Sequence, residues 1–385
     1  MSTERPDSPQ LADRAESWSA AYVHIPFCSR LCPYCDFAVV TGRDSEIDRY
    51  LRALETEIEN EAAWRQLDAI YFGGGTPSRV DPHRLARVLR RLELRFGLSS
   101  DAEISLEANP EDWTTGKAFA LREAGFNRVS FGAQSFDQRT LLALGRRHRP
   151  HQIQEAVTAA RTAGFASINL DLIYGSPSGR LSDWMKSVNS ALEVGIDHLS
   201  CYALTVEPGT DLFRHIAAGG PRPDPDLQAD QWEAANAGAT AAGLVRYEVS
   251  NWARPGHTVR YNLAVWAQAD YLAFGLSAHR FRDGIRSHNF RHLDTYLESI
   301  EGLESPIAGY EPVDGWDREV ERLFLGLRRA AGAVSGPAGA ALLASAEGRR
   351  LEEAGVIRSD GPRLMVGRPL LTDAASRAVL ALSPP

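Results

Sequence analysis

The sequence predicts an α/β protein in which a partial (β/α)6, TIM-like barrel is followed by a smaller C-terminal α+β, winged-helix-like domain. Two observations predict the barrel. Six β-rich runs recur at intervals of 24 to 46 residues, long enough for a crossover helix between parallel strands. Glycine-rich or polar motifs follow most of these runs, as on the active-site rim of a parallel barrel. The runs begin near Tyr22, Asp68, Glu103, Asn127, Ser167 and His198.

The segments between the runs show apolar residues at the spacing of an amphipathic helix, as over 47–62, 82–94 and 181–194. A seventh β-rich run, 245–250, follows a helical stretch that begins near Asp226. Six or seven βα units are too few for a closed eight-stranded barrel, so a partial barrel is expected.

Three regions are predicted along the chain. Residues 1–17 contain Pro6, Pro9 and scattered charges, and we expect a disordered lead-in there. The barrel is expected over 18–254. The C-terminal domain, 255–385, ends in a helix, a small-residue helix, a charged helix, two short strands and a last helix. We interpret this winged-helix-like end as a lid or partner surface.

Composition excludes several classes of protein. The chain has 385 residues, 44% of them hydrophobic, and its 42 basic and 50 acidic side chains give a net charge of −8. This acidic balance argues against a nucleic-acid binder, and four cysteines are too few for a disulfide-stapled scaffold. The polar N-terminus shows no signal peptide and no run is long enough to span a membrane, so a cytoplasmic protein is expected.

The most specific motif is a cysteine loop directly after the first predicted strand. Cys28, Cys32 and Cys35 follow a Cys-x3-Cys-x2-Cys pattern. Three thiolates within eight residues indicate a metal or cluster site, because an ordinary core does not space cysteines in this way. Spacing favours a 4Fe-4S cluster with one open iron; structural zinc and a redox pair remain alternatives.

The motifs after the later strands suit an amino-acid nucleoside. They are GGGTP at 73–77, EANP at 107–110, GAQS at 132–135 and DLIYG at 171–175. Glu107 and Asp171 can accept hydrogen bonds from an ammonium group or ribose hydroxyls. Gln134 and Arg146 can bind a carboxylate or a further hydroxyl. Such a ligand and the cysteine loop would share one rim.

These motifs resemble those of radical S-adenosylmethionine (radical SAM) proteins, and the resemblance covers nearly the whole chain from Tyr22. It is strongest to the branch of oxygen-independent coproporphyrinogen III oxidases and HemW-type heme chaperones, through YVHIPFC-x3-CPYCDF, GGGTP, EANP, GAQSF, LGRRH and NLDLIYGSP. It implies a radical SAM barrel in which Cys28, Cys32 and Cys35 hold a 4Fe-4S cluster. The S-adenosylmethionine contacts that it implies are Tyr22, Phe37, Gly74, Gly75, Thr76, Glu107, Gln134, Arg146 and Asp171.

The resemblance favours the chaperone side of that branch. The oxidases carry a further cysteine two positions after the third ligand, where this chain has Phe37. The chaperones end the loop in CDF, as here, and only 27 residues precede Cys28. The implied function is binding heme as cargo and transferring it to a target protein, expected to be respiratory, with a transient membrane-protein client or a homodimer as further expectations. Coproporphyrinogen III oxidation, or another radical reaction on a tetrapyrrole, is the alternative.

One departure affects the predicted heme ligand. The chaperones have an HNxxYW motif implicated in heme binding, whereas residues 261–266 read YNLAVW. Asn262 and Trp266 match, and Tyr261 is a candidate axial ligand because a tyrosine phenolate can ligate heme iron. His257, four residues earlier, is a second candidate. Cys201 is expected in the core.

Overall fold

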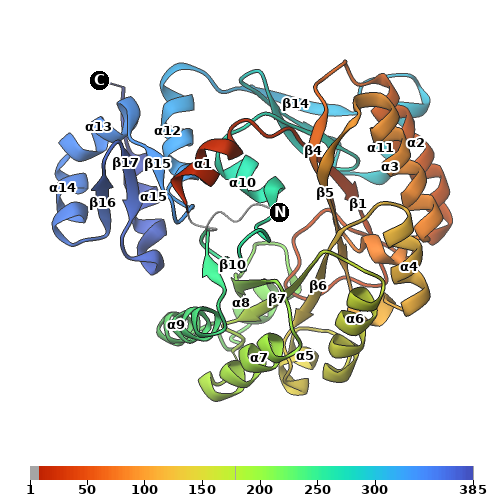
Figure 1. Ribbon diagram of the computed structural model, residues 1–385, viewed down its shortest axis with the longest axis horizontal. Helices are drawn as coiled ribbons and strands as arrows, with labels where there is room; N and C mark the ends of the chain where they lie inside the picture. The colour runs from red at the N-terminus through yellow and green to blue at the C-terminus, as the bar shows by residue number, and fades with distance from the viewer. Residues whose placement is uncertain (1–7, 178, 385) are drawn as a thin grey trace.

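The computed structural model describes residues 8–177 and 179–384. Its main feature is a 12-stranded sheet in which the six predicted strands are neighbours in chain order and pair in parallel. Figure 1 shows helices over the outer side of this curved sheet. The prediction of six parallel strands is confirmed. They are β1 (Ala20–Ile25), β4 (Leu67–Gly74), β5 (Leu98–Ala108), β6 (Arg128–Gln134), β7 (Ser167–Tyr174) and β8 (His198–Ala203).

The covering helices form for reasons that are visible in the sequence. In α3 (Pro82–Phe96), buried Leu85, Leu89 and Leu92 recur at helical spacing. The Asp81 side chain caps the first turn by accepting from the His83 N–H, and a proline is the first residue of the helix. The helices predicted over 47–62 and 181–194 are also present. The remaining helices of this part are α4 (Thr115–Glu123), α5 (Gln138–Ala143), α6 (Pro150–Thr162), α8 (Asp211–Ala217) and α9 (Pro225–Ala241), beside α2 (Ile47–Asn60) and α7 (Leu181–Glu193).

The run 245–250 is not a seventh parallel strand, so that prediction is wrong. Only β9 (Val245–Arg246) is extended there, and the chain turns back into β10 (Asn251–Ala253), which pairs antiparallel with β9 and β8. The Glu248 carboxylate accepts the Ser250 N–H at 3.0 Å and so stabilises the turn.

The sheet continues past residue 254. After α10 (Arg260–Trp266), β11 (Tyr271–Phe274) pairs in parallel with β1. Three antiparallel strands follow: β12 (His279–Arg282), β13 (Ile285–Asn289) and β14 (Ile307–Pro312), with α11 (Leu293–Glu301) before the last. Buried residues on both sides of 254, such as Trp252 and Leu272, belong to one core. The domain boundary at 254 stays a prediction.

The end of the chain has the predicted order of elements and a core of its own. Leu323, Leu342, Leu364 and Val379 are fully buried in it. In Figure 1 this part lies at one side of the large sheet. Its elements are α12 (Gly315–Gly326), β15 (Ala333–Val334), α13 (Gly336–Ala344), α14 (Ala346–Glu353), β16 (Ile357–Asp360), β17 (Arg363–Val366) and α15 (Thr372–Leu380).

The predicted disordered lead-in is wrong from Ser8 onward, and residues 1–7 lie outside the described part of the chain. Helix α1 (Pro9–Ala15) is capped by Ser8 and buries Leu11 and Ala15 against α10. Arg363 donates to the Asp13 carboxylate at 2.7 Å. Helix α1 therefore ties the C-terminal part to the large sheet. Among the described helices, none is long and apolar enough to cross a membrane.

Candidate metal and cofactor site

The cysteine loop leaves the carboxyl end of β1 and is held at both of its ends. Strand β2 (Phe27–Cys28) pairs in parallel with β3 (Val40–Thr41), which closes the loop. The Cys35 N–H donates to the Cys32 carbonyl at 3.1 Å. All three cysteines are half-buried and free of disulfides. The loop therefore presents three thiols within one short, anchored segment.

Two of the three cysteines contact the rim of the sheet. Cys28 Sγ lies 3.4 Å from the Thr76 hydroxyl, and the Arg146 guanidinium donates to Cys32 Sγ at 3.7 Å. Burial raises the pKa of the Cys28 thiol, and it raises the pKa of Cys35 to about 11. Thiols of this kind ionise when a metal replaces their proton.

Three cysteines in one short loop are the donors that a 4Fe-4S cluster with one open iron would take. Within residues 8–177 and 179–384, no three His, Cys, Asp or Glu side chains converge on one point that could hold a single metal ion. Structural zinc needs such convergence, usually of four ligands. In a 4Fe-4S cube each cysteine ligates a different iron, and the Arg146 guanidinium beside Cys32 would offset part of the charge of the thiolates.

Glu107 lies at the end of β5 among groups that hold it in place. Its carboxylate accepts from the Tyr71 hydroxyl at 3.0 Å and from the Gly74 N–H at 3.1 Å. Burial, with the charge of Asp171 as the second cause, raises the pKa of Glu107 to about 7. Glu107 is half-buried, and above its pKa the ionised carboxylate has spare acceptor capacity for a cationic ligand.

Asp171 belongs to a buried polar network inside the sheet. It accepts from the Ser130 hydroxyl at 2.6 Å and from the Asn169 amide at 2.8 Å. Asn169 Oδ1 accepts from His198 Nδ1 at 2.7 Å, and His198 Nε2 contacts the Tyr247 hydroxyl at 2.9 Å. Burial raises the pKa of Asp171. The network fixes the direction of the carboxylate.

Gln134 and Arg146 meet at the end of β6. Gln134 has a φ of 61°, a left-handed conformation that is uncommon outside glycine, at an irregularity in the β6–β7 pairing. Arg146 donates to the Gly132 carbonyl at 3.0 Å and also to the Asn109 side chain. Asn109 in turn donates to Thr76 at 3.4 Å. Asn109 and Tyr71 are thus site residues that sequence reasoning did not assign, although Asn109 lies within the EANP motif.

Packing within the protein requires glycine at two positions of the GGGTP motif, Gly74 and Gly75. A Cβ on Gly75 would lie 2.5 Å from the Pro26 backbone, and a Cβ on Gly74, whose φ is 111°, would lie 2.4 Å from the His24 ring. These glycines therefore bring β4 against the end of β1 and hold Thr76 beside Cys28.

A cavity of about 360 Å³ opens beside these groups. It is lined by four of the predicted S-adenosylmethionine contacts, Tyr22, Phe37, Gly74 and Glu107. Tyr261 lines it too, and its ring stacks on those of Tyr22 and Tyr71 at centroid distances of 5.8 and 5.4 Å. The other predicted contacts do not line this cavity; they are Gly75, Thr76, Gln134, Arg146 and Asp171. Of these, Thr76 and Arg146 lie beside the cysteines.

The predicted heme residues do not gather around one point. Tyr261 faces the cavity, whereas Trp266, five residues later on α10, has its ring under the Arg328 guanidinium at 5.5 Å. Five residues correspond to about 140° around a helix, which explains the divergence. Asn262 is half-buried on the same helix, and the carbonyl of half-buried His257 accepts from Arg128 at 2.6 Å.

Burial decides one further expectation. Cys201 is 1% exposed within the main core, as predicted. Away from the core, His288 on β13 stacks on His279 at a centroid distance of 5.1 Å.

Comparison with known proteins agrees with this geometry. Residues 22–189 match the model of the radical SAM superfamily. The chain is 40% identical to the heme chaperone HemW of Mycobacterium tuberculosis, over 97% of both chains. It is 35% identical to HemW of Bacillus subtilis over 81% of this chain and 84% of that protein. The chain belongs to the HemW family of radical SAM proteins. This family implies a 4Fe-4S cluster and S-adenosylmethionine.

The fold is also that of a solved radical SAM enzyme. The structure superposes on coproporphyrinogen III oxidase (HemN) from Escherichia coli with a TM-score of 0.82, covering 96% of this chain and 92% of the oxidase. At 24% identity this likeness establishes a shared radical SAM fold. The predicted fold class is confirmed, and the assignment to the HemW side of the branch comes from the sequence relatives.

Proposed function

We propose that this chain is a cytoplasmic protein that binds heme and transfers it to a target protein, a respiratory heme protein. The observation that carries the proposal is the 40% identity, over 97% of both chains, to a protein named for heme chaperoning. Phe37 supports the same proposal, because it stands where the oxidases of this branch have a further cysteine. Its side chain is 63% exposed at the mouth of the cavity.

We propose that Cys28, Cys32 and Cys35 hold the cluster and that S-adenosylmethionine lies beside it in the cavity. When bound and reduced, such a cluster supplies one electron for cleavage of the sulfonium. Glu107 would accept the amino group or ribose hydroxyls, and Asp171 lies deeper in the polar network. Arg146, which donates to Cys32 Sγ, would offset the charge of the thiolates.

The remaining predicted contacts have distinct tasks in this proposal. Gly74, Gly75 and Thr76 would set the backbone and one hydroxyl beside Cys28, Gln134 would offer an amide to the ligand, and Tyr22 and Phe37 would exclude water from two sides. Their contacts within the protein support these tasks: the Thr76 hydroxyl lies 3.4 Å from Cys28 Sγ, and Tyr22 lies in a stack of three tyrosine rings.

The test separates chaperone from oxidase. Anaerobically reconstituted protein is incubated with S-adenosylmethionine, a reductant and coproporphyrinogen III, and the products are read by mass spectrometry. A parallel sample is loaded with heme and mixed with an apo-form of a heme protein. We expect intact coproporphyrinogen and a transfer of heme that raises the absorbance of the acceptor. Loss of two carboxyl groups together with formation of 5′-deoxyadenosine would make the chain an oxidase.

A further inference from the structure

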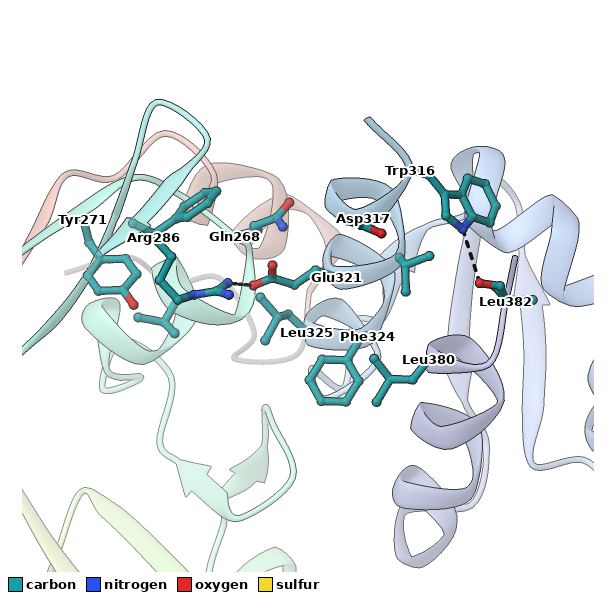
Figure 2. A pocket seen from close by; sticks show the side chains of 13 residues that line it. Gln268, Tyr271, Arg286, Trp316, Asp317, Glu321, Phe324, Leu325, Leu380 and Leu382 are labelled. Atoms are coloured by element: carbon teal, nitrogen blue, oxygen red, sulfur yellow. Dashed lines mark hydrogen bonds and ion pairs between the residues drawn. The ribbon is translucent and has the colours of Figure 1, made fainter. Parts of the chain in front are cut away.

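A second and larger cavity lies away from the cysteine loop, between the edge of the large sheet and α12. This groove has a volume of about 600 Å³, within the range of roughly 300–1,000 Å³ that is usual for ligand pockets. Figure 2 shows it running along α12, with Tyr271 and Arg286 at one end and Trp316 and Leu382 at the other. None of the residues in the sequence motifs for the cluster or S-adenosylmethionine lines it.

The sheet wall of the groove is a row of side chains across three neighbouring strands. Tyr271 on β11 is opposite Phe281 on β12, and Phe281 is opposite Arg286 on β13. Opposed residues in antiparallel strands point to the same face, so the register places the three side chains side by side. The Arg286 guanidinium lies 5.9 Å from the Phe281 ring centroid.

The opposite wall is one face of α12. Trp316, Val320 and Phe324 recur every four residues, as neighbours on a helix do. Leu380 and Leu382, at and after the end of α15, extend this apolar surface. The groove is therefore mostly apolar with two flat aromatic walls, and polar groups are concentrated at the Tyr271 end.

Only one lining residue is of a type that binds heme iron. Histidine, cysteine, methionine and tyrosine serve as axial ligands, and Tyr271 alone of these types lines the groove within the described part of the chain. Burial raises the pKa of Tyr271, the positive charge of Arg286 opposes this shift, and the negative charge of Glu321 adds to it. A second guanidinium, that of exposed Arg318, lies 6.0 Å from the Phe281 ring centroid.

We propose that this groove is the heme site, with the porphyrin between the sheet row and α12, Tyr271 on the iron, and Arg318 and Arg286 facing the propionates. The proposal rests on the proposed function of binding heme. It moves the axial ligand from Tyr261 and His257 to Tyr271. The cavity beside the cysteines has about 360 Å³ and is assigned to S-adenosylmethionine, so it leaves no room for a porphyrin as well.

Bound heme must compete with an ion pair that already crosses the groove. Arg286 pairs with Glu311 at 3.0 Å on the sheet side and with Glu321 on α12 (Figure 2). A propionate would take the place of Glu321 on the guanidinium, since both are carboxylates. The Glu321→Gln variant should therefore bind heme more tightly, by about threefold, whereas simple damage to the groove would weaken binding.

Tyr271 also links the groove to the other cavity, because it lines both. Its ring packs edge-on against Tyr261 at 6.0 Å, and Tyr261 stacks on Tyr22 and Tyr71. A single aromatic layer thus separates the proposed heme site from the proposed S-adenosylmethionine site.

The experiment is a titration of ferric heme into the full-length protein, read from the Soret band, for matched variants. Tyr271→Phe should shift the band and weaken binding by about tenfold or more, and Arg318→Glu should weaken it by about fivefold. The control Arg349→Glu, on exposed α14, should leave band and affinity unchanged. Tyr261→Phe, on the cofactor side, tests the alternative axial ligand and should keep the position of the band. Far-UV circular dichroism checks that each variant is folded, and exposed Arg318 keeps the test valid if Tyr271→Phe does not fold.

The outcomes distinguish this proposal from the one on which it rests. Wild-type protein that binds no heme would overturn both. Tight binding by the wild type with no effect of Tyr271→Phe, Arg318→Glu or Glu321→Gln would overturn only the groove. A band shift in Tyr261→Phe alone would return the axial ligand to the cofactor cavity.

Discussion

The cofactor cavity and the groove are built in opposite ways. The cavity is formed partly where parallel strands end, with Tyr22 on β1, Gly74 on β4 and Glu107 on β5, and residues of 261–291 complete its wall. The groove joins residues from three distant stretches of the chain, 265–286, 316–325 and 380–382, and its wall is mostly apolar. A site at strand ends is specified locally, whereas a site at a junction depends on how two parts of the molecule pack. The following predictions test that difference, from the largest expected effect to the smallest.

Removing a cysteine from the loop should have the largest effect. Cys28→Ser, Cys32→Ser and Cys35→Ser should each abolish the brown absorbance near ~400 nm that a 4Fe-4S cluster gives, because each thiolate holds one iron. Iron content and the visible spectrum after anaerobic reconstitution measure this. Cys201→Ser, in the core away from the loop, is the control and should keep its iron. Full iron retention in all three loop variants would contradict the assignment.

Protonation of Glu107 should govern the affinity for S-adenosylmethionine. Its pKa is raised to about 7, so the carboxylate that accepts the amino group forms mainly above that pH. Affinity should increase roughly tenfold from pH 6 to pH 8, in line with the ionised fraction. Glu107→Gln should bind more weakly than wild type at pH 8 and lose the pH dependence. Calorimetric titration of the reconstituted protein measures both, and an unchanged slope in the variant would exclude Glu107.

The raised pKa of Glu107 increases the affinity for the ligand as the pH rises, but it decreases the free energy of unfolding over the same change of pH. Because the pKa of Glu107 is higher in the folded protein than the usual 4.5, the folded state binds the proton more tightly. The contribution of this group to stability is therefore present below about pH 4.5 and decreases as the pH rises to about 7. Glu107→Gln should make the free energy of unfolding less dependent on pH in that window, as urea titrations would show.

On the junction side, Asp13→Asn should cause a small loss of stability. It removes the 2.7 Å ion pair between α1 and Arg363, whose side chain is 8% exposed and keeps its bonds to the Ala331 and Gly332 carbonyls. We expect a decrease of about 1 kcal/mol in the free energy of unfolding. The control is Glu347→Gln, which breaks an exposed pair with Arg350 on α14 and should cost less. Equal effects would mean that α1 does not fasten the junction.

Phe37→Cys should produce no measurable change in product. It restores the cysteine of the oxidases at an exposed position without altering the walls of the cavity. Incubation with coproporphyrinogen III should still leave the substrate intact. Turnover in this variant would show that one residue separates oxidase from chaperone and that the two share a substrate pocket.

The cofactor side could be predicted from sequence because strand, turn and functional residue follow one another in the chain. The loop with Cys28 and the motif with Glu107 each sit at the end of a strand whose buried pattern is unambiguous. Asn109 cannot be assigned in the same way, because its contact with Arg146 joins the end of β5 to the segment between α5 and α6.

The junction could not be predicted in the same way. Nothing in the short run 271–274 indicates that β11 pairs in parallel with β1, since its partner lies some 250 residues earlier. That pairing, together with α12 across the groove, places Tyr271 in the wall of the groove. Helix α1 had local signals, namely the Ser8 cap and Leu11 and Ala15 four residues apart. The prolines and scattered charges of residues 1–17 nevertheless favoured disorder.

The most direct test of two separate sites is a heme titration with and without saturating S-adenosylmethionine, on anaerobically reconstituted protein. The account predicts one heme per chain in both cases, with the Soret band in place, because the groove and the cavity lie on opposite sides of Tyr271. Displacement of heme by S-adenosylmethionine, or of S-adenosylmethionine by heme, would put both ligands in one cavity and contradict the account.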